Sequence, residues 1–154
     1  MLLFVFISVF SCQNSSPANQ KKLFPKNIKV FDLNIFASET TSDDKIVHAA
    51  KILAQYLDND EDGVVDNKVV HSMLKSRNAS LVMFNNEFEA EIAWRSGVYE
   101  FPENSQALFD EETIPSFDKS NSNQRFDASL EEILHLITHE GYSHVYSELK
   151  EEKG

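Results

Sequence analysis

Aspartates occupy every second position from residue 58 to residue 62, and another aspartate follows at position 66. The stretch reads Asp58-Asn59-Asp60-Glu61-Asp62-Gly63-Val64-Val65-Asp66. Calcium in proteins takes six to eight oxygen ligands at about 2.3–2.6 Å, and alternate residues of a tightly wound loop can turn their carboxylates toward one point. Gly63 adopts at little steric cost the backbone conformation that lets a chain wrap an ion. The spacing therefore predicts a loop that binds Ca²⁺.

This pattern resembles the loop of EF-hand proteins and the related calcium loops of dockerins and thrombospondin type 3 repeats, over residues 58–69 only. The resemblance implies ligands, in chain order, from the side chains of Asp58, Asp60 and Asp62, the carbonyl of Val64, and Asp66 directly or through a water. It also implies that Gly63 makes the sharp turn and that Val65 packs beneath the loop.

The twelfth position departs from that family, which has a bidentate glutamate where this chain has Val69. One strong ligand is therefore missing in the standard register. Either the ion binds weakly, or a carboxylate from elsewhere completes the site, or water takes the position. The alternative for the whole stretch is an acidic, solvated turn between two helices, without an ion.

Three of the five histidines lie within ten residues near the end of the chain. His135 and His139 are four residues apart, so on a helix they project from one face, one turn apart. This spacing can hold a transition metal between two imidazoles. Glu131 lies one turn further back on the same face. We therefore predict a Zn²⁺ site with His135, His139 and Glu131 as ligands, and with His144 as a further candidate.

Residues 131–144 also show a looser resemblance to the H-E-x-x-H helix of zincin-type metallopeptidases. Three residues, not two, separate Glu140 from His144, which rotates His144 by about 100° on a regular helix. A π-helical turn near Gly141 would restore the pairing of His139 with His144. The resemblance implies a hydrolase in which Glu140 or Glu132 is the base for a metal-bound water. The alternative is a solvated helix face with ordinary histidines, and the isolated His48 and His71 are expected to be packed or surface residues.

Length and charge limit the classes of function. A chain of 154 residues with 42% hydrophobic residues suits one domain with a substantial core. Its formal charge of −11 repels nucleic acid and anionic lipid but suits divalent cations. Nucleic-acid binding is therefore not expected.

The chain begins with ten almost wholly apolar residues, which are too few to span a bilayer and are typical of a secretory signal. The stretch Val9-Phe10-Ser11-Cys12 resembles a bacterial lipoprotein cleavage box. This resemblance implies a lipid on Cys12 that anchors the protein to a membrane. The alternative is a plain secretory signal with an incidental cysteine. We predict a signal over residues 1–12, a linker over 13–26, and over 27–154 either a single domain or a fragment of a longer one.

Hydrophobic periodicity predicts an α+β fold with a helix–calcium loop–helix unit, a few short strands and a long C-terminal helix carrying the histidines. The expected strands cover residues 28–36, 80–84 and 106–109, and the expected helices cover 43–57, the region of Val69–Leu74, 87–94, and a segment starting at Ser129 and reaching at least Thr138. Ser129 and Glu132 suggest a capping box at the start of that last helix. Its core-facing stripe is expected to be Leu130, Ile133, Leu134, Ile137 and Gly141.

Two functions fit this pattern. The first is a secreted or lipid-anchored metalloprotein with a calcium loop and a zincin-like, peptidase-like hydrolase helix. The second is a non-catalytic extracellular module that uses calcium for rigidity or adhesion.

Overall fold

The structure is a computed structural model that describes residues 23–117, 120 and 125–149. Its elements follow in this order: β1 (Lys26–Val30), β2 (Leu33–Ala37), α2 (Asp43–Leu57), α3 (Lys68–Ser76), β3 (Ser80–Phe84), α4 (Glu87–Arg95), β4 (Ser105–Phe109), η1 (Asp110–Glu112), α5 (Ala128–Ile137), η2 (Thr138–Tyr142), α6 (Ser143–Val145) and η3 (Ser147–Leu149). The fold is α+β, as the periodicity predicts. The predictions made for residues 1–22, including Cys12, lie outside the described residues.

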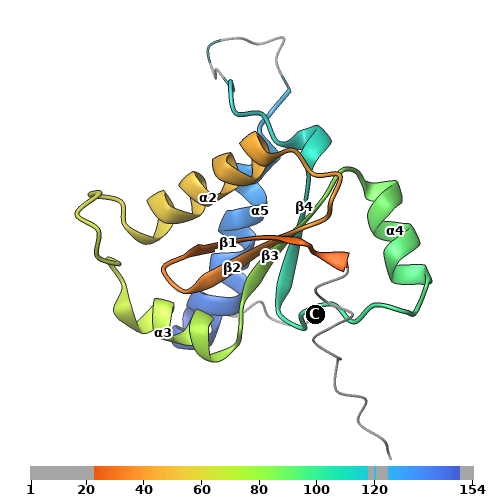
Figure 1. The fold of residues 1–154 in the computed structure, drawn as a ribbon. Helices are drawn as coiled ribbons and strands as arrows, with labels where there is room; N and C mark the ends of the chain where they lie inside the picture. Colours follow the sequence, from red (N-terminus) through yellow and green to blue (C-terminus); the bar gives the residue numbers. More distant parts are fainter. Residues whose placement is uncertain (1–22, 118–119, 121–124, 150–154) are drawn as a thin grey trace, which may run out of the picture.

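One four-stranded sheet organises the fold, with the strands in the order β1-β2-β3-β4 (Figure 1). β1 and β2 are antiparallel, whereas β2, β3 and β4 run parallel to one another. All five residues of β3 are buried, as expected for an apolar strand with parallel neighbours on both sides. Because the three parallel strands point the same way, the residues that follow them meet at one edge of the sheet.

Helices cover both faces of this sheet. On one face α2, α3 and α5 contribute Leu53, Leu74 and Ile133 to the main core, which also takes Leu81 and Met83 from β3. On the other face α4 packs on a smaller cluster, and side chains alternate between the two faces as strand geometry requires. The cluster under α4 contains Phe24, Val82, Phe84, Ala90 and Ala93. The buried Phe24 means that the chain joins the domain before the predicted boundary at residue 27.

The predicted single strand over residues 28–36 is wrong, because the chain reverses direction within it. Phe31 and Asp32 both have positive φ, 44° and 68°, and they form a two-residue turn between β1 and β2. Such turns usually contain Asn-Gly or Asp-Gly pairs. Here α3 holds the turn instead. Nε2 of His71 lies 2.6 Å from the carbonyl oxygen of Phe31, and Lys75 pairs with Asp32 at 2.7 Å.

The helices on either side of the acidic loop match the prediction. α2 starts directly after Ser42 and buries Ile46, Ala49, Leu53 and Leu57, which recur at helical spacing. α3 starts after Asn67, whose side-chain oxygen accepts the N–H of Val70 at 3.1 Å. Among the described residues, no helix combines the length and apolar character that a membrane span would need.

The C-terminal helical segment runs from α5 through η2 into α6. Its N-cap is Asp127, not Ser129, so the predicted capping box is wrong: the hydroxyl of Ser129 donates to Asp127 at 2.7 Å. Three members of the predicted core-facing stripe are buried, namely Ile133, Ile137 and Gly141, whereas Leu130 is half-buried and Leu134 is exposed. Leu136, which is not predicted to face the core, is buried. The segment η2 is one π-helical turn, which widens the helix at the position proposed for a π-bulge.

Candidate functional site

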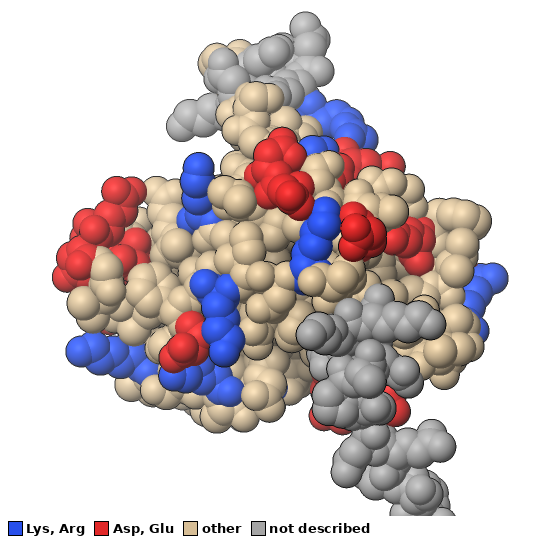
Figure 2. Space-filling model, in the orientation of Figure 1, with Lys and Arg blue, Asp and Glu red and all other residues tan. Residues whose placement is uncertain are grey.

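The acidic loop between α2 and α3 brings three carboxylates together. Asp58, Asp60 and Asp66 each present an oxygen atom such that these atoms all lie within 4.8 Å of one another. Asp58 is buried, whereas Asp60 and Asp66 are exposed. Figure 2 shows acidic side chains gathered at the end of the molecule where Figure 1 places this loop. Among the described residues, this is the group of His, Cys, Asp and Glu side chains whose spacing could hold a metal ion.

Backbone amides fix the shape of this loop. The carboxylate of Asp58 accepts the N–H of Asp62 at 3.1 Å and the N–H of Gly63 at 2.8 Å. The carboxylate of Asp66 accepts the N–H of Asn59 at 2.9 Å. Gly63 has φ +84°, the left-handed conformation that the calcium-loop resemblance implies. The chain therefore wraps around the carboxylates, with the first and last aspartates drawn together.

The remaining loop positions differ in their roles. The carboxylate of Asp62 is not part of the three-residue group, because it accepts the N–H of Val64 at 2.8 Å and closes a local turn. Val65 packs against the main core, as the resemblance implies. Val69, at the family's glutamate position, is 61% exposed and offers no side-chain oxygen.

The histidine helix places its side chains differently from a closed zinc site. The rings of His135 and His139 are stacked, with centroids 5.7 Å apart and planes 9° apart, so the two histidines do share a face. His135 lies 3.9 Å from the carboxylate of Glu131 and 3.8 Å from that of Glu132. His144 is exposed. No three of these groups come within the 4.8 Å spacing that the loop aspartates reach in the described part of the chain.

Both candidate catalytic glutamates already have partners. Glu140 accepts from Arg77, with Nε at 2.8 Å and Nη2 at 2.7 Å from the same carboxylate oxygen. Glu132 accepts from the side-chain amide of Gln106 at 2.5 Å. In this arrangement Glu140 links the π-helical turn to the end of α3, and Glu132 links α5 to β4. A role as general base would require either carboxylate to exchange its present donor for a water.

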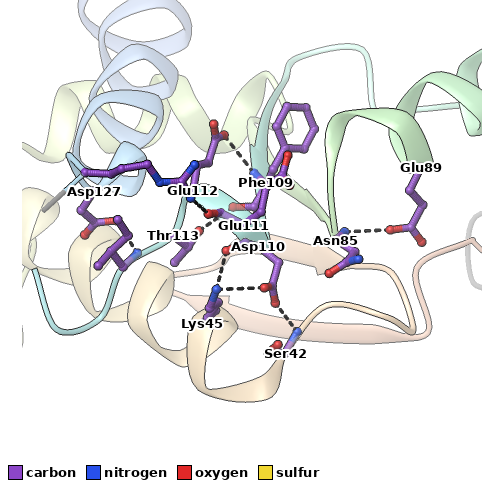
Figure 3. Close-up of polar contacts among 12 residues, drawn as sticks. Ser42, Lys45, Asn85, Glu89, Phe109, Asp110, Glu111, Glu112, Thr113 and Asp127 are labelled. Carbon is purple, nitrogen blue, oxygen red and sulfur yellow. Dashed lines mark hydrogen bonds and ion pairs between the residues drawn. The ribbon is translucent and has the colours of Figure 1, made fainter.

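A second polar cluster lies at the edge where the three parallel strands end, and our sequence analysis missed it (Figure 3). After β4, Asp110 accepts the N–H of Ser42 at 2.6 Å and pairs with Lys45 at 2.9 Å. After β3, the N–H of Asn85 donates to Glu89, which also accepts the hydroxyl of Thr40. A polar residue follows each of these strands in the sequence. To predict that these residues cluster, however, one must know that the strands run parallel, which the sequence does not provide.

The buried carboxylates of this region are held ionised by their donors. Burial alone would raise the pKa of Asp110, but the hydrogen bonds from Ser42 and the charge of Lys45 outweigh it and lower the pKa. Asp127 behaves alike: burial opposes its charge, yet donors including His48 at 2.7 Å lower its pKa. Lys45 balances the charge of Asp110, and the hydrogen bonds of the two aspartates tie α2 and α5 to the sheet edge. His48 is thus a packed histidine, as expected.

Comparison of the chain with protein-family models, with curated proteins and with solved structures finds no match. The EF-hand and zincin resemblances therefore stand on the residues themselves.

Proposed function

We propose that the chain is a calcium-binding protein in which the loop between α2 and α3 holds the ion. The observation that carries the proposal is the convergence of Asp58, Asp60 and Asp66 within 4.8 Å. Three negative charges this close repel one another, and a divalent cation placed among them removes that repulsion. The flexible, oxygen-rich shell of Ca²⁺ suits such a loop better than the strict octahedron of Mg²⁺ does.

The ligand set would be completed from the loop itself and from solvent. Asp62 and the carbonyl of Val64 are the other protein ligands that the resemblance implies. Because Val69 replaces the bidentate glutamate, we expect water to take that position, and we expect the affinity to fall toward the range of extracellular modules, about 10⁻⁴–10⁻³ M. Such an affinity suits a secreted or lipid-anchored protein that is always exposed to calcium, and it agrees with the strongly acidic composition.

The ion would serve rigidity in this proposal. α2 and α3 both pack on the main core, and the loop sets the angle at which one follows the other. A bound ion would hold that angle, so the supported function is a non-catalytic calcium-binding module with a structural or adhesive role.

The test compares thermal unfolding with and without calcium in two matched variants. Asp60→Ala removes one proposed ligand and its charge, whereas Glu61→Gln removes the same charge from the adjacent position outside the three-residue group. Calcium should raise the Tm of the wild type and of Glu61→Gln, and Asp60→Ala should lose most of the rise. An equal loss in both variants would mean that calcium only screens the acidic loop, and it would contradict the proposal.

A second candidate function is a transition-metal site on the histidine helix, with peptidase-like hydrolysis as its activity. The observation that favours it is the π-helical turn η2, which changes the angle between His139 and His144 in the direction the zincin resemblance requires. The candidate ligands are His135, His139, Glu131 and His144, with Glu140 or Glu132 as base. Zn²⁺ would supply a bound water of lowered pKa.

Metal analysis tests this second candidate without an assay of activity. Purified protein that is dialysed against zinc should retain about one ion per chain, and a double variant, His135→Ala with His139→Ala, should lose it while calcium binding is unchanged. Retention of zinc by that double variant would show that these two histidines are not the ligands. Absence of zinc from the wild type would leave the calcium module alone.

A further inference from the structure

The helix α3 joins the acidic loop to the π-helical turn, and Asn67 makes contact with both. Asn67 directly follows Asp66, and its side-chain oxygen caps α3 by accepting the N–H of Val70 at 3.1 Å. Its amide nitrogen lies 3.3 Å from the hydroxyl of Tyr146, at the end of the segment that carries the histidines. A movement of Asn67 at the end of the loop would therefore change its contact with the C-terminal segment.

The middle of α3 packs against the π-helical turn without spare room. A Cβ placed on Gly141 would lie 2.8 Å from Cγ1 of Val70 and 3.2 Å from atoms of Leu74, so only glycine allows this approach. Both of these partners are buried, and Val70 is a stiff, branched side chain. We therefore expect a shift or rotation of α3 to move the backbone of η2, because the stiff Val70 and the buried Leu74 have little free space in which to absorb the change.

The far end of α3 is fixed to the same turn by charge. Arg77, directly after the helix, donates to Glu140 through Nε and Nη2, and its Nη2 also donates to Asn104 at 3.0 Å. Asn104 in turn donates to the carbonyl of Arg77 at 2.5 Å. Glu140 stands between His139 and Gly141, so the ion pair acts on the residue next to a candidate metal ligand.

From these three contacts we infer that calcium binding in the acidic loop controls the geometry of the histidines on the π-helical turn. This inference rests on the proposed calcium binding. The ion orders the loop and the start of α3, and α3 transmits the change to η2 through the contacts of Val70, Leu74 and Arg77. π-Helical turns are uncommon and depend on their surroundings, so η2 is an element whose population a shift of α3 can change.

The coupling is reciprocal. If calcium binding favours the π-helical turn by some factor, then any change that favours this turn raises the affinity for calcium by the same factor. A transition metal held by His139 and His144 would thus raise the calcium affinity, and calcium would raise the affinity for that metal. In calcium-rich surroundings, this coupling would hold His139 and His144 in the geometry that suits a second metal. The effect of calcium on the two histidines can be observed without that second metal.

The experiment follows the imidazole resonances of the five histidines by NMR during a calcium titration, alongside calorimetry of the same samples. His139 and His144 should shift with the apparent Kd measured by calorimetry. His48, bonded to Asp127 at the other end of α2, is the internal reference and should shift much less.

Two variants identify the path. Arg77→Gln removes the ion pair with Glu140, and Tyr146→Phe removes only the hydroxyl that meets Asn67. Each should bind calcium with little change in heat, while the His139 and His144 shifts fall by half or more in at least the first variant. Arg95→Gln, which breaks an exposed pair with Glu91 on α4, should leave the shifts unchanged.

The outcomes separate the two proposals. Heat of calcium binding without movement of the His139 and His144 resonances would overturn the coupling and leave calcium binding intact. Shifts of full size in both Arg77→Gln and Tyr146→Phe would also overturn it, because α3 would not be the path. Absence of heat in well-folded protein would overturn calcium binding, and the coupling with it.

Discussion

At the scale of single residues, Asp127 is a buried carboxylate that joins three parts of the chain. It is 1% exposed, it caps α5, and its two oxygens accept from Ser129, the N–H of Ile114 and the ring of His48. A buried carboxylate with this many donors stabilises the fold only while all of them are satisfied. The acidic loop uses aspartates in the opposite way, because its carboxylates lie together and repel one another.

We expect Asp127→Asn to lower the free energy of unfolding by about 2–3 kcal/mol, because an amide keeps the shape but accepts at one oxygen and carries no charge. Urea denaturation measures the loss. Asp43→Asn is the matched control, since the Asp43 side chain is 84% exposed and its pair with Lys26 should contribute below about 1 kcal/mol. Equal losses in the two variants would mean that the Asp127 network is worth no more than a surface pair.

The lowered pKa values of Asp127 and Asp110 also predict a pH dependence of stability. The ionised forms of these two aspartates favour the folded state. Their contribution to the free energy of unfolding is fully present above the unfolded-state pKa of about 4, and it is lost as the pH falls through the lower folded-state pKa. Glu112 acts in the opposite sense: burial raises its pKa, so its contribution is present at low pH and is lost as the pH rises through that raised value.

Urea unfolding between pH 7 and pH 2.5 tests this sign. The free energy of unfolding of the wild type should fall below pH 4 in parallel with protonation of Asp110 and Asp127. Asp127→Asn should show a shallower fall over the same range, because one of the two carboxylates is gone. An unchanged slope in the variant would show that other acids govern the acid unfolding.

At the scale of elements, the sequence predicts those whose signal is local. The apolar run Ser80–Phe84 gives β3 with the predicted bounds, and Ser42 with the acidic residues after it gives the start of α2. The spacing of Asp58, Asp60 and Asp66 gave three candidate ligands, and the structure brings these three together. In each case the deciding residues are neighbours along the chain.

Elements that depend on distant contacts were missed or misplaced. The turn at Phe31 and Asp32 has no glycine and is held by His71 and Lys75 of α3, forty or more residues away. Asp127 is favoured as the N-cap of α5 because its carboxylate also accepts hydrogen bonds from His48 and from the N–H of Ile114. Ser129 does not have these two donors. Leu134 and Leu136 exchange places because packing, not periodicity alone, sets the rotation of the helix.

Gly141 supports a prediction at this scale. Gly141→Ala should lower the free energy of unfolding by about 1–3 kcal/mol, because the added Cβ meets Val70 at 2.8 Å, although alanine is the better helix former. Val70→Ala should relieve the clash, so the double variant should lose less than the sum of the two single losses. Additive losses would mean that the contact is not the cause.

At the scale of the whole molecule, a formal charge of −11 complicates any statement about cations. Every cation stabilises such a protein to some extent by screening, and the effect of screening grows with ionic strength without saturating at one ion. Specific binding differs in that it saturates, with a stability gain of about 2.7 kcal/mol at a hundred times Kd. Work at constant, moderate salt with magnesium as the competing cation therefore separates the two effects.

Isothermal titration calorimetry of calcium into the well-folded protein tests the central claim most directly. We predict saturable binding of one ion per chain that magnesium does not reproduce, that Asp60→Ala abolishes and that Glu61→Gln preserves. No saturable heat with calcium raised well above the expected Kd of about 10⁻⁴–10⁻³ M, or the same curve for wild type and Asp60→Ala, would contradict the account.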